Sequence, residues 1–107
     1  MNSNFCQLWL TVGSKEEADK IANTLLVKHL AACVKQVPVT SGFSWQGKIE
    51  SNKEVLLVMD SVLELFGEIE AEVKKLHSYD TFVLQAIPVT KISKGAEGWL
   101  RSELNNA

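Results

Sequence analysis

Four stretches of the chain have the alternating or β-branched apolar residues that are typical of strands. These stretches are Phe5–Val12, Ala32–Trp45, Lys48–Met59 and Thr81–Thr90. The second and third are separated only by Gln46-Gly47, a dipeptide suited to a two-residue hairpin turn. The end of the third, Val55–Met59, is continuously apolar, which predicts burial on both of its faces. The pattern therefore predicts a sheet that contains one long hairpin.

Helical spacing of apolar residues predicts three helices between and after these strands. Ser14 and Glu17 form a capping box that starts the first helix, which runs out near His29. Ser61 and Glu64 form a second capping box before the next helix. The apolar face of that helix consists of Val62, Leu65, Phe66, Ile69, Val73 and Leu76. A short terminal helix carries Trp99, Leu100 and Leu104.

The order strand–helix–strand–strand–helix–strand, followed by a final helix, predicts the fold class. It is typical of an α+β, ferredoxin-like βαββαβ sandwich, here with an extra C-terminal helix and a long hairpin between the second and third strands. The expected strand order is 4-1-3-2, with the first two helices on one face of the sheet. The 107 residues contain no linker or repeat, so residues 1–107 are expected to form a single domain.

The other face of this sheet is predicted to contact a partner. Two helices cover one face only, yet both sides of the strands carry apolar residues; in the fourth strand Leu84 and Ala86 oppose Ile87 and Val89. An uncovered apolar face is typical of an interaction surface, and the simplest partner is another copy of the chain. We therefore expect a homo-oligomer.

Charge and composition exclude several classes of partner. The net charge is −2 and the pI is about 5.6, which argues against a nucleic-acid footprint and against binding to anionic membranes by charge. No apolar run approaches the roughly 20 residues of a membrane span, so no direct membrane insertion is expected. Cys6 and Cys33 are too few for a disulfide scaffold, which favours a reduced, cytoplasmic protein.

Two functions associated with this topology fit the residues poorly. Phe5 and Trp9 resemble a base-stacking platform, but the third strand lacks the basic, aromatic motif of RNA-recognition domains, so buried oligomer contacts are the favoured interpretation. Gly13 and the following helix start could hold a small anion, but a plain turn is favoured, since the single arginine, Arg101, lies almost at the C-terminus. No nucleophile–base pair can be assembled, so the chain is not expected to be an enzyme.

Three groups of residues are candidate metal ligands. Cys6 and Cys33 lie on strands that are not neighbours in the expected order, which argues against a disulfide and favours two small core residues. His77 ends the second helix, where it is either a capping residue or a ligand. An acidic series at i,i+4 spacing could hold a hard cation, although a solvated helix face is favoured; it comprises Glu64, Glu68 and Glu72.

Four segments together resemble a known family. They are Ala32-Cys33-Val34, Phe43-Ser44-Trp45-Gln46-Gly47-Lys48, Glu54-Val55-Leu56 and Leu76-His77-Ser78-Tyr79. In this order and spacing they look like the CutA family, the divalent-cation tolerance proteins, over roughly Leu8 to Leu104. The resemblance implies a ferredoxin-like fold and a tight homotrimer with sheets inward and helices outward. It also implies a role in copper and divalent-cation tolerance.

The resemblance also implies site residues. The hairpin tip would contact a neighbouring subunit through Phe43 and Trp45, with Gly47 permitting the turn. The metal ligand would be His77, with Cu(II) or another divalent cation as cofactor. A ligand cleft between subunits would contain Cys33, Trp45, Lys48, Glu54, Tyr79 and Asp80.

Three departures from the family pattern leave an alternative open. Leu10, Leu76 and Val83 stand where the family has a cysteine, a histidine and a glutamate. Copper favours imidazole and thiolate ligands, so these changes weaken the expected copper site. The alternative to a metal-responsive trimer is a PII-like small-molecule sensor, or a structural or protein-docking trimer with a degenerate metal site.

Overall fold

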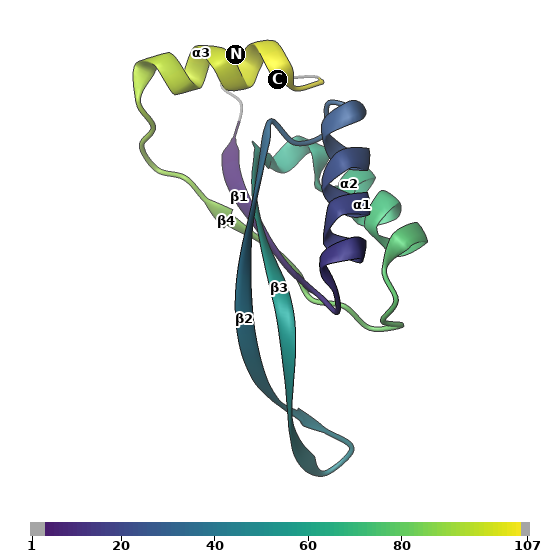
Figure 1. The fold of residues 1–107 in the computed structure, drawn as a ribbon. Coiled ribbons are helices and arrows are strands. Elements are labelled where there is room, and N and C mark those ends of the chain that lie inside the picture. Colours follow the sequence, from purple (N-terminus) through teal and green to yellow (C-terminus); the bar gives the residue numbers. More distant parts are fainter. Residues whose placement is uncertain (1–3, 106–107) are drawn as a thin grey trace.

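A four-stranded antiparallel sheet, flanked by helices on one side, forms the centre of the fold (Figure 1). The computed structural model describes residues 4–105. Its elements are β1 (Phe5–Val12), α1 (Lys15–Val27), β2 (Cys33–Trp45), β3 (Lys48–Val62), a 3₁₀ turn (Leu63–Leu65), α2 (Phe66–Leu76), β4 (Leu84–Pro88) and α3 (Lys94–Glu103). The strand order β2-β3-β1-β4 is the predicted one.

The hydrophobic core lies between the sheet and the pair of helices α1 and α2, which lie on the same side of the sheet (Figure 1). Alternation places every second residue of β1 and β3 on this side, and those that lie beneath the helices are buried. The core contains Leu8, Leu10, Val12, Leu57 and Met59 from the strands and Ile21, Leu25, Ile69 and Val73 from the helices. The predicted one-sided arrangement of the two helices is confirmed.

The capping box predicted at the start of the first helix consists of two reciprocal hydrogen bonds between Ser14 and Glu17, and one of the two forms. The backbone N–H of Glu17 donates to Ser14 Oγ at 3.2 Å, which satisfies an N–H that has no partner within the helix. The Glu17 carboxylate does not return to the cap; it accepts a hydrogen bond from the backbone N–H of Ser78 at 3.2 Å. This side chain therefore joins α1 to the segment after α2.

The second capping prediction, at Ser61, is wrong. Strand β3 continues to Val62, and Ser61 pairs with Cys6 of β1 inside the sheet. Its fully buried hydroxyl donates to the carbonyl oxygen of Leu30 at 2.6 Å rather than to a helix N-terminus. A 3₁₀ turn follows, and α2 begins only at Phe66. The Ser-x-x-Glu pattern could not reveal this partner, which lies 31 residues away.

The long hairpin forms as predicted. Gln46 and Gly47 have φ angles of 49° and 78°, and a two-residue type I′ turn requires positive φ at both positions. The register pairs Trp45 with Lys48 and continues to Cys33 and Asp60. The hairpin projects beyond the helices, so the molecule is elongated, with extents of 47 × 25 × 22 Å (Figure 1).

The side of the sheet opposite α1 and α2, here called the open face, carries exposed apolar residues. Trp9, Val37 and Ile87 are 38%, 43% and 40% exposed. Within Val55–Met59 only Leu57 and Met59, which face the helices, are buried. The predicted burial on both faces does not occur in the single chain, because none of its described residues covers the open face. Strand β4 is also shorter than the predicted Thr81–Thr90, and its first predicted residues form a loop instead.

Helix α3 closes the end of the sheet away from the hairpin tip (Figure 1). Leu100 and Leu104 are buried in the core, and the guanidinium of Arg101 lies 5.2 Å from the centre of the Phe5 ring. Asn105 donates a side-chain hydrogen bond to the carbonyl oxygen of Lys28 at 2.8 Å. The predicted terminal helix is therefore an integrated part of the fold.

Candidate functional site

A cavity of about 570 Å³ lies on the open face, between the hairpin and the loop that follows α2. Strand alternation explains its composition, because the odd residues of β2 and the even residues of β3 share this face. The lining residues are Thr11, Ser41, Phe43, Ser44, Trp45, Glu50, Asn52, Glu54 and residues 79–83. Aromatic walls with a few carboxylates therefore surround one space.

The structure brings together some of the predicted site residues and separates others. Trp45, Glu54, Tyr79 and Asp80 line this cavity, as does the predicted interface residue Phe43. Lys48 follows the turn and is exposed at the hairpin tip, and Cys33 lies at the far end of β2. Lys48 and Cys33 are not among the lining residues.

The sequence analysis missed several residues of the cavity. Glu50, Asn52 and Ser41 line it together with Phe82. Strand parity could have identified the first two, since they share a face with Glu54 on the same predicted strand. Phe82 and its neighbours could not be found this way, because the predicted fourth strand included them whereas they belong to a loop.

Glu54 and Tyr79 form the central polar contact of the cavity. Glu54 is only 8% exposed, and its Oε2 accepts a hydrogen bond from the Tyr79 hydroxyl at 2.5 Å. Burial, this hydrogen bond and the negative charges of Glu54 and Glu17 raise the pKa of Tyr79 to about 12. The phenol is therefore a protonated donor that compensates the buried carboxylate.

Gly13 leaves space for the Tyr79 ring. A Cβ atom at position 13 would lie 3.3 Å from the Tyr79 hydroxyl oxygen and 3.6 Å from the nearest ring carbon. The glycine that follows β1 thus contributes more than a turn, because a side chain here would crowd the Tyr79 hydroxyl at its contact with Glu54.

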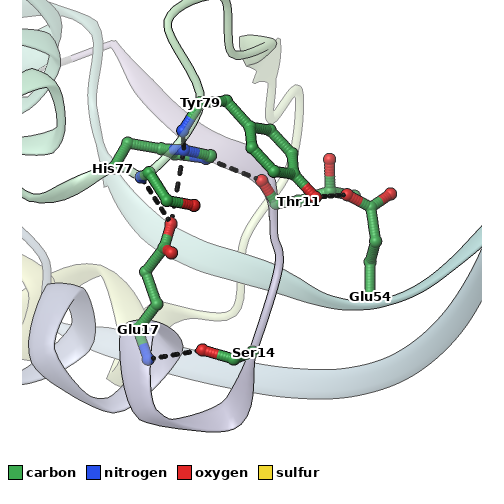
Figure 2. Close-up of polar contacts among 7 residues, drawn as sticks. Thr11, Ser14, Glu17, Glu54, His77 and Tyr79 are labelled. Atoms are coloured by element: carbon green, nitrogen blue, oxygen red, sulfur yellow. Dashed lines mark hydrogen bonds and ion pairs between the residues drawn. The ribbon is translucent and has the colours of Figure 1, made fainter.

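His77 is the C-cap of α2, and its side chain is completely buried. Its Nε2 lies 2.9 Å from the carbonyl oxygen of Thr11, and its Nδ1 lies 3.0 Å from the backbone nitrogen of Tyr79 (Figure 2). Glu17 Oε2 is 3.3 Å from the same Nδ1. The predicted metal ligand is therefore in contact with β1, α1 and the loop after α2.

The two cysteines lie apart from this site. Cys6 is buried in β1, where burial raises the pKa of its thiol to about 11, with smaller contributions from Glu64 and Asp60. Cys33 lies in β2, separated from β1 by β3, and both thiols are free, as the strand order predicts. Lys35 Nζ lies 3.6 Å from Cys33 Sγ and 3.5 Å from Asp60 Oδ2, and these two groups raise the pKa of the Lys35 ammonium, Asp60 more strongly.

The donor set of one chain does not fit a complete Cu(II) site. Among residues 4–105, no group of three or more His, Cys, Asp or Glu side chains is arranged to hold a metal ion. Leu10, at one family ligand position, is buried in the core. The cavity offers the carboxylates of Glu50, Glu54 and Asp80, and oxygen donors suit harder cations better than copper.

Fold and site together define the class of protein: a ferredoxin-like α+β domain with a projecting hairpin and a cleft between that hairpin and the loop after α2. A family profile described as CutA1 divalent ion tolerance protein matches residues 6–103. The chain therefore belongs to the CutA family of divalent-ion tolerance proteins, as the sequence motifs predict.

Individual relatives support this assignment. The chain is 42% identical over 93 residues to the divalent-cation tolerance protein CutA of Archaeoglobus fulgidus, covering 87% of this chain and 91% of the relative. A solved structure from that organism, described as periplasmic, is 39% identical with a TM-score of 0.92, over 94% of this chain and 99% of that chain. The CutA1 structure from Oryza sativa superposes with a TM-score of 0.94 at 27% identity, over 98% and 97% of the two chains.

The names of the relatives include more than one compartment. The Arabidopsis thaliana protein CutA, 33% identical over 100 residues, is described as chloroplastic; the match covers 92% of this chain and 55% of that relative. Within residues 4–105, no helix is long and apolar enough to cross a membrane.

Proposed function

We propose that this chain acts in divalent-cation tolerance as a cytoplasmic homotrimer that binds a cation at clefts between its copies, without catalysing a reaction. The observation that carries this proposal is the open face, an apolar sheet surface that the described residues of one chain leave uncovered. Its half-exposed residues include Trp9, Val37 and Ile87. Burying this apolar area between copies is favourable, at about 25 cal/mol per Å² removed from water.

The hairpin supports the same assembly. Trp45 is 51% exposed and Ile49 is 89% exposed, and no residue from 32 to 53 is buried. A hairpin of this length with aromatic residues near its turn has little of its own core to pack against. Phe43 and Trp45 therefore act as contacts to a neighbouring copy, with Gly47 supplying the turn.

The cleft supports cation binding in an assembly more than in one chain. The carboxylates of Glu54, Glu50 and Asp80 line one cavity. The donors that the described residues of one chain lack would come from a second copy. Cu(II) or another divalent cation is the proposed ligand. A second candidate, a small organic ligand, is favoured by the volume of about 570 Å³ and by the aromatic walls at Phe43, Trp45 and Phe82.

Measuring the mass of the protein by light scattering at nanomolar concentration tests the assembly. We expect the wild type to have the mass of three chains and Trp45→Ala to dissociate at higher concentration, because buried aromatic residues commonly dominate such contacts. The matched control is Trp99→Ala, since Trp99 is similarly exposed, at 46%, but lies on α3. A monomeric wild type, or equal dissociation of both variants, would contradict the proposal.

Calorimetric titration with Cu(II) and Mn(II) tests the cleft. A cation held by the cavity should bind more weakly to Glu54→Gln, in which a buried carboxylate becomes a neutral amide of the same shape. Absence of heat and of any thermal shift with both metals would favour the small-ligand alternative.

A further inference from the structure

The two ring nitrogens of His77 have different partners, and these partners determine the tautomer. A carbonyl oxygen can only accept, so Nε2 must carry the hydrogen that it donates to Thr11 O at 2.9 Å. A backbone N–H can only donate, so Nδ1 must be the acceptor for the Tyr79 N–H at 3.0 Å. With Nε2 donating and Nδ1 accepting, both ring nitrogens are engaged inside the chain, and neither offers a free lone pair to a metal ion.

The surroundings of the ring hold it in this orientation. The ring stacks on Phe82, with centroids 5.1 Å apart and an interplanar angle of 16°. Glu17 Oε2 accepts the Ser78 N–H at 3.2 Å beside Nδ1, so α1 also anchors the first residue after the histidine (Figure 2). His77 thus connects the end of β1 to the loop that covers the cavity.

Tyr79 transmits this constraint to the cleft. Its backbone nitrogen is held by His77, and its hydroxyl, passing over Gly13, donates to Glu54 Oε2 at 2.5 Å. Two rotatable side-chain bonds separate the anchored backbone from the phenol, so fixing the backbone restricts where the hydroxyl can lie. Glu54 keeps one oxygen in this hydrogen bond, which determines how its carboxylate faces the cavity.

We propose that His77 is a positioning residue of the cleft and not a metal ligand. Its hydrogen bonds hold the backbone of Tyr79, and through Tyr79 they orient the Glu54 carboxylate. Its effect on ligand binding rests on the proposed function of the cleft. The positioning of Tyr79 does not, because it follows from contacts within one chain.

The tautomer can be measured directly on the wild type. The sequence contains two histidines, so nitrogen-15 NMR resolves both rings at a pH where imidazoles are neutral. We expect His77 to be protonated on Nε2 and His29 to show the opposite tautomer, since its Nδ1 donates to the Glu103 carbonyl oxygen at 3.0 Å. A His77 protonated on Nδ1 would overturn the proposal without any variant having to fold.

The positioning of Tyr79 can be measured because it is the only tyrosine. In His77→Ala we expect phenol ionisation at lower pH than in the wild type, as the hydroxyl loses its fixed place beside Glu54 and becomes more solvated. His77→Asn should recover part of the difference, since its side-chain oxygen can accept the N–H two residues later. The control His29→Ala should titrate like the wild type.

Two results would exclude positioning by His77. One is an ionisation curve of His77→Ala that coincides with that of the wild type. The other is an Asn variant that titrates like the Ala variant, which removes the Tyr79 N–H contact from the explanation.

Titration with Zn²⁺, which is diamagnetic, separates this proposal from the proposed function. If the nitrogen-15 signal of His77 Nε2 or Nδ1 shifts or disappears at one equivalent of Zn²⁺, His77 is a metal ligand and the positioning role is wrong. If Zn²⁺ binds, leaves the His77 ring signals in place and binds more weakly to His77→Ala, the result supports both the cation function and the positioning role. If no metal binds but Tyr79 titrates as expected, the cation function fails and the positioning role stands.

Discussion

Replacing Glu54 with glutamine should make Tyr79 easier to ionise. In the wild type, burial, the 2.5 Å hydrogen bond to Glu54 and nearby negative charge raise the pKa of Tyr79 to about 12. The amide keeps the shape of the carboxylate but removes its charge. A hydrogen bond to a charged group contributes about 1.5–3 kcal/mol, and one pKa unit corresponds to about 1.4 kcal/mol.

The lower end of this range applies, because Tyr79 is only partly buried and solvent screens part of the interaction. We therefore expect the pKa of Tyr79 to fall by about one unit. At about pH 11, roughly one-tenth of the wild-type phenol and roughly one-half of the variant phenol would be ionised. Burial, the largest cause of the shift, remains in the variant and keeps its pKa above the ordinary value.

Ultraviolet difference spectroscopy of the phenolate band measures this change without labelling, since Tyr79 is the single tyrosine. The control is Glu50→Gln, which neutralises an exposed carboxylate on the same cavity. Far-ultraviolet circular dichroism at each pH verifies that the chain is still folded. Coincident curves for wild type and Glu54→Gln would refute the role given to this hydrogen bond.

Three further predictions concern stability. Because the pKa of Tyr79 is raised in the folded state, the protonated phenol stabilises the fold fully below about pH 10, and this stabilisation is lost as the pH rises toward 12. The urea midpoint of the wild type should therefore fall between these pH values, and a constant midpoint would contradict the prediction. Leu57→Ala should lower the free energy of unfolding by about 2–5 kcal/mol, since Leu57 is fully buried, whereas Leu26→Ala, at a 39% exposed position, should cost much less. Gly47→Ala should destabilise the fold by about 1 kcal/mol, because φ at this turn residue is +78°. The control Gly42→Ala should have little effect, since φ is not positive there and the new Cβ would meet open space. Equal urea midpoints for the two variants would contradict the turn assignment.

The sequence predicted the sheet well because its signals are local. Alternation in β1 and β3, together with the turn at Gln46-Gly47, determined the hairpin, and the order of elements then determined the strand order. Ser61 shows where local signals fail. Its spacing to Glu64 fits a helix cap, but its hydroxyl donates instead to the carbonyl oxygen of Leu30, 31 residues earlier in the chain. Burial of a polar group favours whichever partner is available inside the fold.

The site was predicted less completely, because its contacts join distant segments. Glu54 and Tyr79 were both predicted to lie in one cleft, and both line the cavity. Their hydrogen bond, the clearance at Gly13 and the two partners of His77 depend on how the loop after α2 crosses the end of β1. No spacing within the sequence encodes that crossing, so the metal-ligand prediction at position 77 depended on the residue type and on the family resemblance.

In the proposed assembly, the projecting hairpin would couple the folding of each chain to its association with other copies. From residue 40 to residue 53 the two strands pair only with each other, and none of these residues is buried. Such a segment opens easily by itself, so in an isolated copy its amide hydrogens would exchange quickly with solvent. Contact with other copies would protect those amides, and mass action would then raise the melting temperature with protein concentration. In the proposed assembly, the stability of each chain would therefore depend on the concentration of its copies.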